Sequence, residues 1–151
     1  MRNFVLFAVA ALLTAGASAQ QPSQPDGLAC FENLAAPEFP MSALRAHVDG
    51  SVWTYVHVSP QSVPEQIETQ VVSAWGKAPQ LLTPPVEKAL RAAKAKPECA
   101  GKTVTVVFRY QLSGEPTQNP KVTSRTEIPN LLWIESQPAL GSESGKAHQS
   151  D

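Results

Sequence analysis

Few residues of this 151-residue chain have the type and spacing that catalysis or metal binding requires. The three histidines are His47, His57 and His148, and no two of them stand at the spacing of a metal-ligand pair. The sequence contains no G-x-S-x-G, no H-E-x-x-H and no phosphate-binding loop. Glu65 and Glu68 are neighbours, but paired acids near a turn between strands are usually solvated. The sequence therefore predicts no catalytic residue, no metal site, no cofactor and no enzyme.

The N-terminal segment has the features of a signal peptide. Arg2 precedes an apolar run at residues 4–13, and Ala17-Ser18-Ala19 has the small-x-small pattern that signal peptidase cleaves. The run is shorter than the about 20 residues that span a bilayer, and no cysteine at the cleavage point marks a lipoprotein. We therefore predict a signal peptide over residues 1–19 and a soluble product, periplasmic or secreted, without stable membrane insertion. The alternative is an inner-membrane anchor formed by the same segment without cleavage.

The charge of the chain argues against nucleic acid as a partner. The formal net charge is −1, and it becomes about −2 without residues 1–19, where Arg2 is the only charged residue. Basic residues are nonetheless dense between Lys77 and Arg109, where only Glu87 and Glu98 oppose them. Two interpretations of this basic segment stay open: a solvated helix face, which is the commoner case, or a patch that docks a partner.

The two cysteines, Cys30 and Cys99, predict a disulfide. An exported chain folds in an oxidising compartment, where an even cysteine count favours pairing. The bridge would close a loop of about 70 residues, which the chain-entropy model values at up to about 4 kcal/mol. A redox-active pair is the weaker alternative, because the sequence has no C-x-x-C.

Composition divides the exported chain into three parts. Residues 20–27 are rich in Gln, Pro and Ser and predict a flexible lead-in. Residues 136–151 have almost no apolar side chains and predict a disordered tail. The folded domain is therefore expected over residues 28–135, which suffices for one small two-layer core.

The periodicity of the first half predicts a helix followed by a hairpin. Residues 41–48 are compatible with a short helix. Residues 51–59 and 66–74 alternate between apolar and polar side chains, as strands do. Residues 59–64 include two prolines and form a loose connection, so the two strands are expected to pair antiparallel.

The second half predicts a helix and at least one strand. Thr83 is expected to cap a helix that ends before Pro97, with an apolar stripe for the sheet. That stripe consists of Val86, Ala89, Leu90 and Ala93. Residues 103–112 alternate strongly, and residues 131–134 favour a further short strand. We predict an α+β fold: a small antiparallel sheet of three to four strands with two helices packed on one face.

This order of elements resembles the C-terminal domain of the TonB energy-transducer family over residues 37–112. Pro37, Phe39 and Pro40 resemble the opening motif of that family, a proline, an aromatic residue and a proline before a helix. Gly50-Ser51-Val52 is similar to its glycine–x–valine start of the first strand, and Gly101-Lys102 to its turn before the third. The order of these motifs at compatible spacing carries the resemblance.

The resemblance implies a binding module without catalysis. In that family the domain grips an extended peptide of an outer-membrane receptor against the edge of the third strand, which is β-augmentation. Carried over to this sequence, the partner is a protein of the outer membrane or the periplasm. The implied peptide-binding edge comprises Lys102, Thr103, Thr105, Val107, Arg109 and Gln111.

The chain departs from the family in three places. About 16 residues separate Gln20 from Pro37, and they reach about 55 Å when fully extended, so coupling to an inner-membrane motor is not expected. Residues 59–64 replace the acidic glycine turn between the first two strands. Residues 121–135 are an addition, and if they paired with the third strand they would fill the binding edge.

A structural or assembly role is the alternative function. Trp53, Tyr55 and Trp133 are aromatic side chains expected on sheet faces, and aromatic residues are enriched where proteins meet. In this hypothesis the strand edge is already closed, and the domain packs on a partner or forms a homodimer.

Overall fold

The computed structural model describes residues 27–141. The predicted signal peptide, nearly all of the predicted lead-in and residues 142–151 of the predicted tail lie outside the described residues. The predicted domain boundary at residue 135 falls inside the folded part. Ser136 ends the last strand, and Ala139 is buried and donates its N–H to the carbonyl of Leu44, 3.3 Å away.

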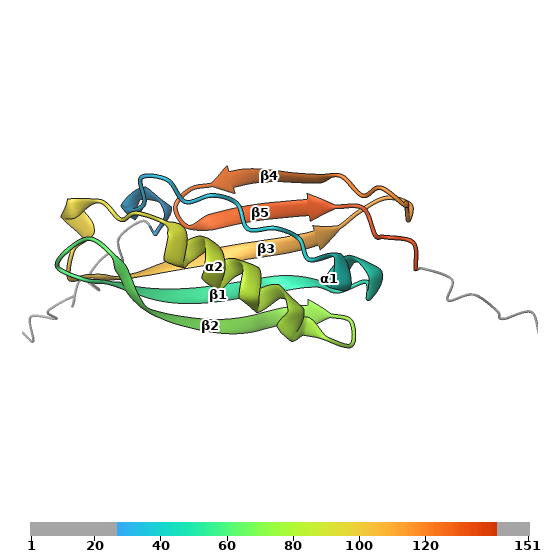
Figure 1. The fold of residues 1–151 in the computed structure, drawn as a ribbon, viewed down its shortest axis with the longest axis horizontal. Coiled ribbons are helices and arrows are strands. Elements are labelled where there is room, and N and C mark those ends of the chain that lie inside the picture. Colours follow the sequence, from blue (N-terminus) through green and yellow to red (C-terminus); the bar gives the residue numbers. More distant parts are fainter. Residues whose placement is uncertain (1–26, 142–151) are drawn as a thin grey trace, which may run out of the picture.

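Five strands form a single mixed sheet in the order β2-β1-β3-β5-β4 (Figure 1). The strands are β1 (Asp49–Val58), β2 (Pro64–Trp75), β3 (Thr103–Leu112), β4 (Val122–Glu127) and β5 (Leu131–Ser136). β1 pairs antiparallel with β2 and β3, and β4 pairs antiparallel with β5. β3 and β5 run parallel, because the chain passes to β4 at the edge before β5 returns between β4 and β3.

The α+β class is therefore confirmed, while the predicted strand count and the all-antiparallel pairing were wrong. Residues 122–127 show no alternating pattern, and all six residues of β4 are exposed. A strand with no buried face leaves no periodic signal to detect. The predicted antiparallel pairing of residues 51–59 and 66–74 is confirmed, with Trp53 opposite Gln70 and Val56 opposite Ile67.

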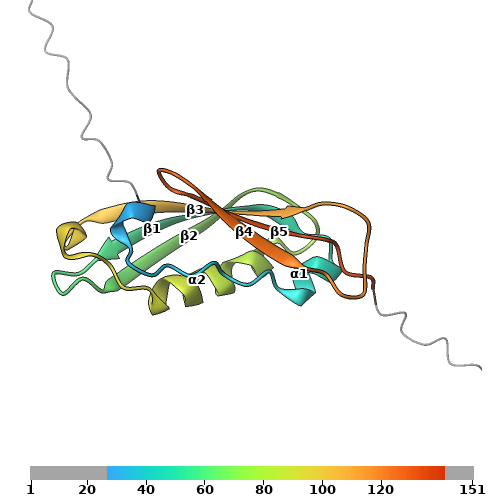
Figure 2. The same cartoon turned by 90° about the horizontal axis from the view of Figure 1, so that it is seen from above.

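The helices cover one face of this sheet (Figure 2). They are α1 (Met41–Arg45) and α2 (Thr83–Ala92). Three short 3-10 turns lie before α1, before α2 and after α2: η1 (Leu28–Cys30), η2 (Pro79–Leu82) and η3 (Pro97–Cys99). Thr83 is the first residue of α2 and does not cap it through its side chain. α2 ends at Ala92, short of the predicted end, because the next residues pair with the N-terminal segment: Glu32 donates to the carbonyl of Lys94, and Lys96 to that of Cys30.

The core lies between the helices and the sheet. Val52 and Val56 of β1 and Phe108 of β3 are fully buried, in the same core cluster as Val86 and Leu90 of α2. Burying a side chain of this size is worth about 1.5–3 kcal/mol, so the alternating valines of the strands carry much of the stability. The predicted apolar stripe of α2 is confirmed for Val86, Leu90 and Ala93, whereas Ala89 is only partly buried.

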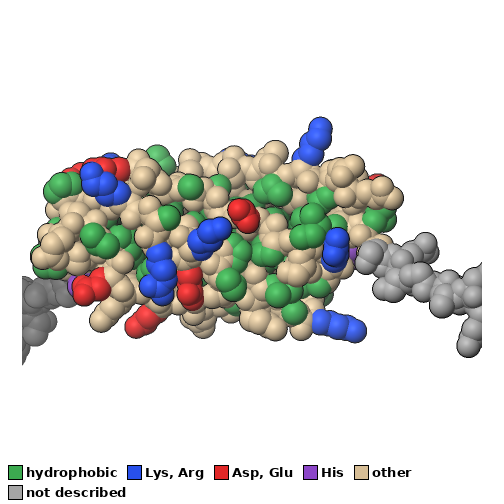
Figure 3. Space-filling view, in the orientation of Figure 1, with side chains coloured by type: hydrophobic (Ala, Val, Ile, Leu, Met, Phe, Trp, Pro, Cys, Tyr) green, Lys and Arg blue, Asp and Glu red, His purple; other side chains and the backbone are tan. Residues whose placement is uncertain are grey.

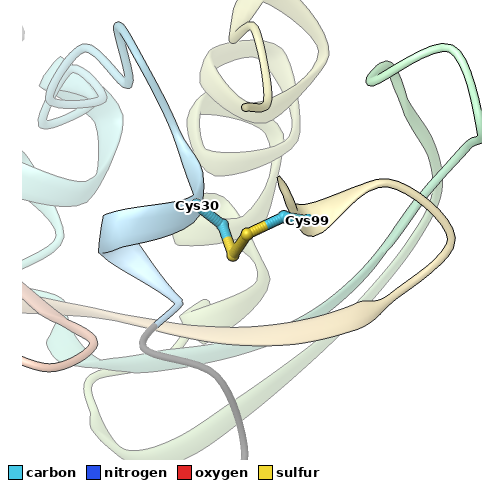
Figure 4. Close-up of a disulfide and its surroundings, with 2 residues drawn as sticks. All are labelled: Cys30 and Cys99. Carbon is cyan, nitrogen blue, oxygen red and sulfur yellow. A yellow bond between two sulfur atoms is a disulfide. The ribbon is translucent and has the colours of Figure 1, made fainter. Parts of the chain in front are cut away.

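A disulfide joins Cys30 of η1 to Cys99 of η3, as the sequence predicted (Figure 4). The two Cα atoms are 5.7 Å apart, and both residues are buried. The bridge fixes the N-terminal segment to the turn that leads into β3.

No helix within residues 27–141 is long and apolar enough to cross a membrane. The apolar run at residues 4–13 lies outside that range.

Candidate protein-binding surfaces

The predicted peptide-binding edge of β3 is occupied by the chain itself. β5 lies alongside it, with Val107 opposite Leu131, Arg109 opposite Trp133 and Gln111 opposite Glu135. The N–H of Val107 donates to the carbonyl of Asn130 at 2.8 Å. From Val107 to Leu112, β3 therefore has β5 on the side where a peptide was expected to bind.

Before Val107 the same edge is covered at Thr105, while Lys102 and Thr103 have partners in other parts of the chain. The backbone of Gly27 lies against the carbonyl of Thr105, and the N–H of Leu28 donates to the carbonyl of Pro129 at 3.3 Å. Lys102 donates its N–H to Cys99 and accepts from Val58, so its backbone is paired too. Thr103 lies opposite His57, and its hydroxyl is 3.3 Å from the His57 Nδ1 atom.

The face of the sheet opposite α1 and α2 carries several aromatic side chains. The register places Trp53 beside Val107, and Val107 beside Leu131. Trp133 follows two residues after Leu131 on the same face, and Tyr55 follows two residues after Trp53. We call this surface the aromatic face; it comprises Trp53, Tyr55, Val107, Leu131 and Trp133. Trp53 and Tyr55 are 40% and 38% exposed, so large apolar rings remain accessible to solvent.

Charged and polar side chains lie at the margin of the aromatic face, and two of them contact Trp133. The indole N–H of Trp133 donates to the Oε2 atom of Glu127 at 2.9 Å, and the guanidinium of Arg125 lies 4.6 Å from the centre of the Trp133 ring. Arg125 also pairs with Glu135 at 3.4 Å, and Arg109 donates to the hydroxyl of Ser51 at 3.1 Å. An apolar centre with aromatic residues, surrounded by arginine and polar side chains, is the composition of protein interfaces.

A separate hollow lies on the opposite, helix-covered side. A cavity of about 520 Å³ opens between the segment before α1 and the outer side of α2. Its walls are mostly alanine and proline, including Pro37 and Pro40, and two of its lining residues, Glu38 and Lys88, are charged.

The basic segment of the sequence maps mainly to the helix-covered face and the turns beside it. Figure 3 shows basic and acidic side chains next to one another on this face. Arg91 pairs with Glu87 at 3.9 Å, and Lys94 pairs with Glu32 at 3.1 Å. Exposed pairs of this kind contribute little to stability, and they match a solvated face more closely than a single-sign docking patch.

Within the described part of the chain, neither His47 nor His57 belongs to a group of metal-ligating side chains. His57 borders a polar hollow of about 120 Å³ with Tyr55, Gln66, Glu68 and Thr103, and His47 is an exposed turn residue after α1. His148 lies outside the described residues. Among residues 27–141, no three His, Cys, Asp or Glu side chains gather as a metal site requires.

The proline–aromatic–proline motif before α1 has a packing role in the fold. Phe39 is buried, and its ring meets the ring of Tyr110 edge-on, with centroids 5.0 Å apart. Burial raises the pKa of the Tyr110 phenol well above its ordinary value, because the phenolate would lose its hydration. Pro37 is buried, and Pro40 directly precedes α1.

Both motif glycines have positive φ: Gly50 lies near the start of β1, at an irregularity of its pairing with β2, and Gly101 lies in a turn. Gly50 has φ 155°, and a Cβ there would come within 2.8 Å of the Cα of Ala74. Gly101 has φ 72° in the turn before β3, and its N–H donates to the carbonyl of Val58 at 2.8 Å.

No protein-family model matches the sequence, and no curated protein matches it significantly. The resemblance to the TonB C-terminal domain accordingly rests on the quoted motifs and the order of the elements.

Proposed function

We propose that this protein is a non-catalytic binding module of the cell envelope or the secreted space, and that it holds a protein partner on the aromatic face. The observation that carries the proposal is the pairing of β3 with β5. Because β5 fills the edge of β3 from Val107 to Leu112, this stretch offers no vacant backbone to a peptide, whereas the aromatic face leaves two large rings partly exposed to solvent.

The composition of the surface supports a protein partner. Partly exposed Trp53 and Tyr55 bring large apolar area at a small cost in conformational entropy, which is why such residues dominate interface energetics. The ring of Trp133 is already fixed by Glu127 and Arg125, so little freedom is lost when a partner packs on it. The TonB-like motifs add support for protein contact as the role.

The proposed location rests on the disulfide and on the predicted signal peptide. A buried bridge such as Cys30–Cys99 persists in oxidising compartments and is rare in the cytosol. A soluble exported protein that binds another envelope protein fits both features.

Site-specific photo-crosslinking tests the proposal. A photoreactive amino acid at Val107 would stand in the centre of the aromatic face, and one at Met41 would stand on α1, on the opposite side. We expect protein adducts in the native cells from position 107 and not from position 41. Equal labelling from both positions, or none from 107, would argue against the aromatic face as the contact surface.

A truncation series then measures the contribution of the rings. Trp53→Ala should weaken binding of the captured partner at least 30-fold, which corresponds to about 2 kcal/mol for a central aromatic side chain. Met41→Ala, which also removes an exposed apolar side chain (47% exposed), should leave binding unchanged. Equal binding by the Trp53→Ala and Met41→Ala proteins would contradict the proposal.

A further inference from the structure

β4 is an open edge of the sheet. It pairs with β5 on one side, and within residues 27–141 no strand lies along its other side. All six of its residues are exposed, and their sequence is VTSRTE. Such an edge presents unpaired N–H and C=O groups at the spacing of a strand.

The pairing inside the sheet determines which residues of β4 point outward. The N–H of Val107 donates to Asn130, and the N–H of Ser113 donates to Ser136, so the even-numbered residues of β5 direct their backbone groups to β3. Leu131, Trp133 and Glu135 then direct theirs to β4, where they lie opposite Glu127, Arg125 and Thr123. Val122, Ser124 and Thr126 consequently turn their N–H and C=O groups away from the sheet.

We propose that a second copy of this chain pairs with this edge, antiparallel and about a two-fold axis at Ser124. In this register Ser124 lies opposite Ser124 of the other copy, and Val122 lies opposite Thr126. The three outward-facing residues of each copy then form about six backbone hydrogen bonds. Two five-stranded sheets become one continuous sheet.

Charge complementarity favours a copy of the same chain and selects this register. With the axis at Ser124, exposed Lys121 of each copy lies opposite Glu127 of the other, and Arg125 lies opposite Thr123. With the axis at Arg125, two guanidinium groups would face each other. With the axis at Thr123, Lys121 would face Arg125. Opposite charges in direct cross-strand positions stabilise pairing, and like charges oppose it.

The residues that flank β4 limit the ladder to the strand. Pro120 would be the next outward-facing position, and proline has no N–H to donate. At the other end the chain turns at Pro129 into β5. The contact is therefore short, and we expect a weak, concentration-dependent dimer. This dimer goes beyond the proposed function, because the pairing of β4 with a second copy uses none of the five residues of the aromatic face.

Engineered disulfides test the register directly. The Cα atoms of two directly opposed residues in a hydrogen-bonded antiparallel pair are about 5.5 Å apart, within the range that a disulfide spans. We expect Ser124→Cys, in the mature protein with Cys30–Cys99 intact, to give a covalent dimer under mild oxidation. Thr123→Cys, one residue away, and Gln70→Cys, exposed on the opposite edge strand β2, serve as controls and should give at least fivefold less. Equal cross-linking at Ser124, Thr123 and Gln70 would overturn the register.

A charge swap tests the cross-strand ion pair. Lys121→Glu or Glu127→Lys alone should weaken dimerisation several-fold in sedimentation equilibrium, because each sets like charges opposite one another. The double variant Lys121→Glu/Glu127→Lys restores opposite charges and should recover the dimer. A protein that stays monomeric at millimolar concentration, with no cross-link at Ser124, would refute the pairing. Photo-crosslinking of a partner from Val107 in a Ser124→Pro protein reports separately on the aromatic face, so the two proposals fail independently.

Discussion

The backbone N–H of Val107 donates to the carbonyl of Asn130 at 2.8 Å and joins the middle of β3 to the start of β5. This bond begins the parallel register that continues through Arg109 and Trp133 to Leu112 and Ser136. It turns β3 from the expected edge strand into an interior strand and moves the open edge to β4.

The amide of Val107 should therefore exchange slowly with solvent when no peptide is present. Hydrogen exchange followed by NMR should give Val107 protection close to the global free energy of unfolding, because opening this bond requires β5 to leave. The amides of Ser124 and Thr126, which point away from the sheet, should exchange orders of magnitude faster in dilute protein. Fast exchange at Val107 would show instead that β5 is detached in solution.

Removing the disulfide should lower the stability substantially. Cys30 and Cys99 are 69 residues apart in the sequence. Closing a loop of this length contributes up to about 4 kcal/mol to the free energy of unfolding, and this contribution is lost with the bridge. We expect the melting temperature of a Cys30→Ser/Cys99→Ser protein to fall by at least about 10 °C relative to the oxidised protein. Reducing agent should lower the melting temperature of the parent protein and leave that of the double variant unchanged. An identical melt of the two proteins, or free thiols in the purified native protein, would contradict a structural bridge.

Alanine at the two motif glycines should have unequal effects. At Gly50 the new Cβ would meet the backbone of Ala74 at 2.8 Å, in addition to the strain of φ 155°, so we expect a loss of more than about 2 kcal/mol. At Gly101 no atom lies within 4 Å of the Cβ position, and the left-handed φ of 72° alone should cost about 1 kcal/mol. Urea denaturation measures both variants. A larger loss at Gly101 than at Gly50 would be inconsistent with the close approach of Gly50 to Ala74.

Alkaline pH should destabilise the fold through Tyr110. Burial raises the pKa of its phenol, so the unfolded chain loses this proton near its ordinary pKa of about 10 while the folded protein keeps it. The free energy of unfolding should be unaffected by this group below about pH 9, and should fall above pH 10 by up to about 1.4 kcal/mol per pH unit.

Tyr110→Phe keeps the ring beside Phe39 and removes the titrating group. This variant should lose the alkaline slope and retain only a small constant offset from the missing 3.4 Å hydrogen bond to the carbonyl of Glu38. Chemical denaturation at several pH values from 7 to 11 measures the slope, with a thiol assay to verify the disulfide. Parallel pH profiles of the two proteins would rule out Tyr110 as the cause.

The sequence predicted those features that depend on local patterns. Alternation at residues 51–59, 66–74 and 103–112 predicted β1, β2 and β3, because β1 and β3 each have one buried face and β2 has one partly buried face. The pairing of Cys30 with Cys99 followed from their being the only two cysteines.

The features that were missed depend on contacts far apart in the chain. α2 stops at Ala92 because Lys94 and Lys96 pair with Glu32 and Cys30, which no pattern within the helix reveals. A final strand was expected near residues 131–134, but its place beside β3 is a choice among several edges, and hydrophobic periodicity does not encode that choice. For the same reason, the sequence did not show that β5 occupies the predicted peptide-binding edge of β3.

The late position of β5 in the sequence has a consequence for how the protein is made. Every residue that builds β1, β2, α2 and β3 leaves the ribosome, and crosses any membrane, before Leu131 does. Until then the edge of β3, a strongly apolar strand, is unpaired in the newly made chain, and such an edge is prone to aggregation or to binding by chaperones. A nonsense mutation after Leu112 would make that transient hazard permanent, even though the helices and the disulfide would still be encoded.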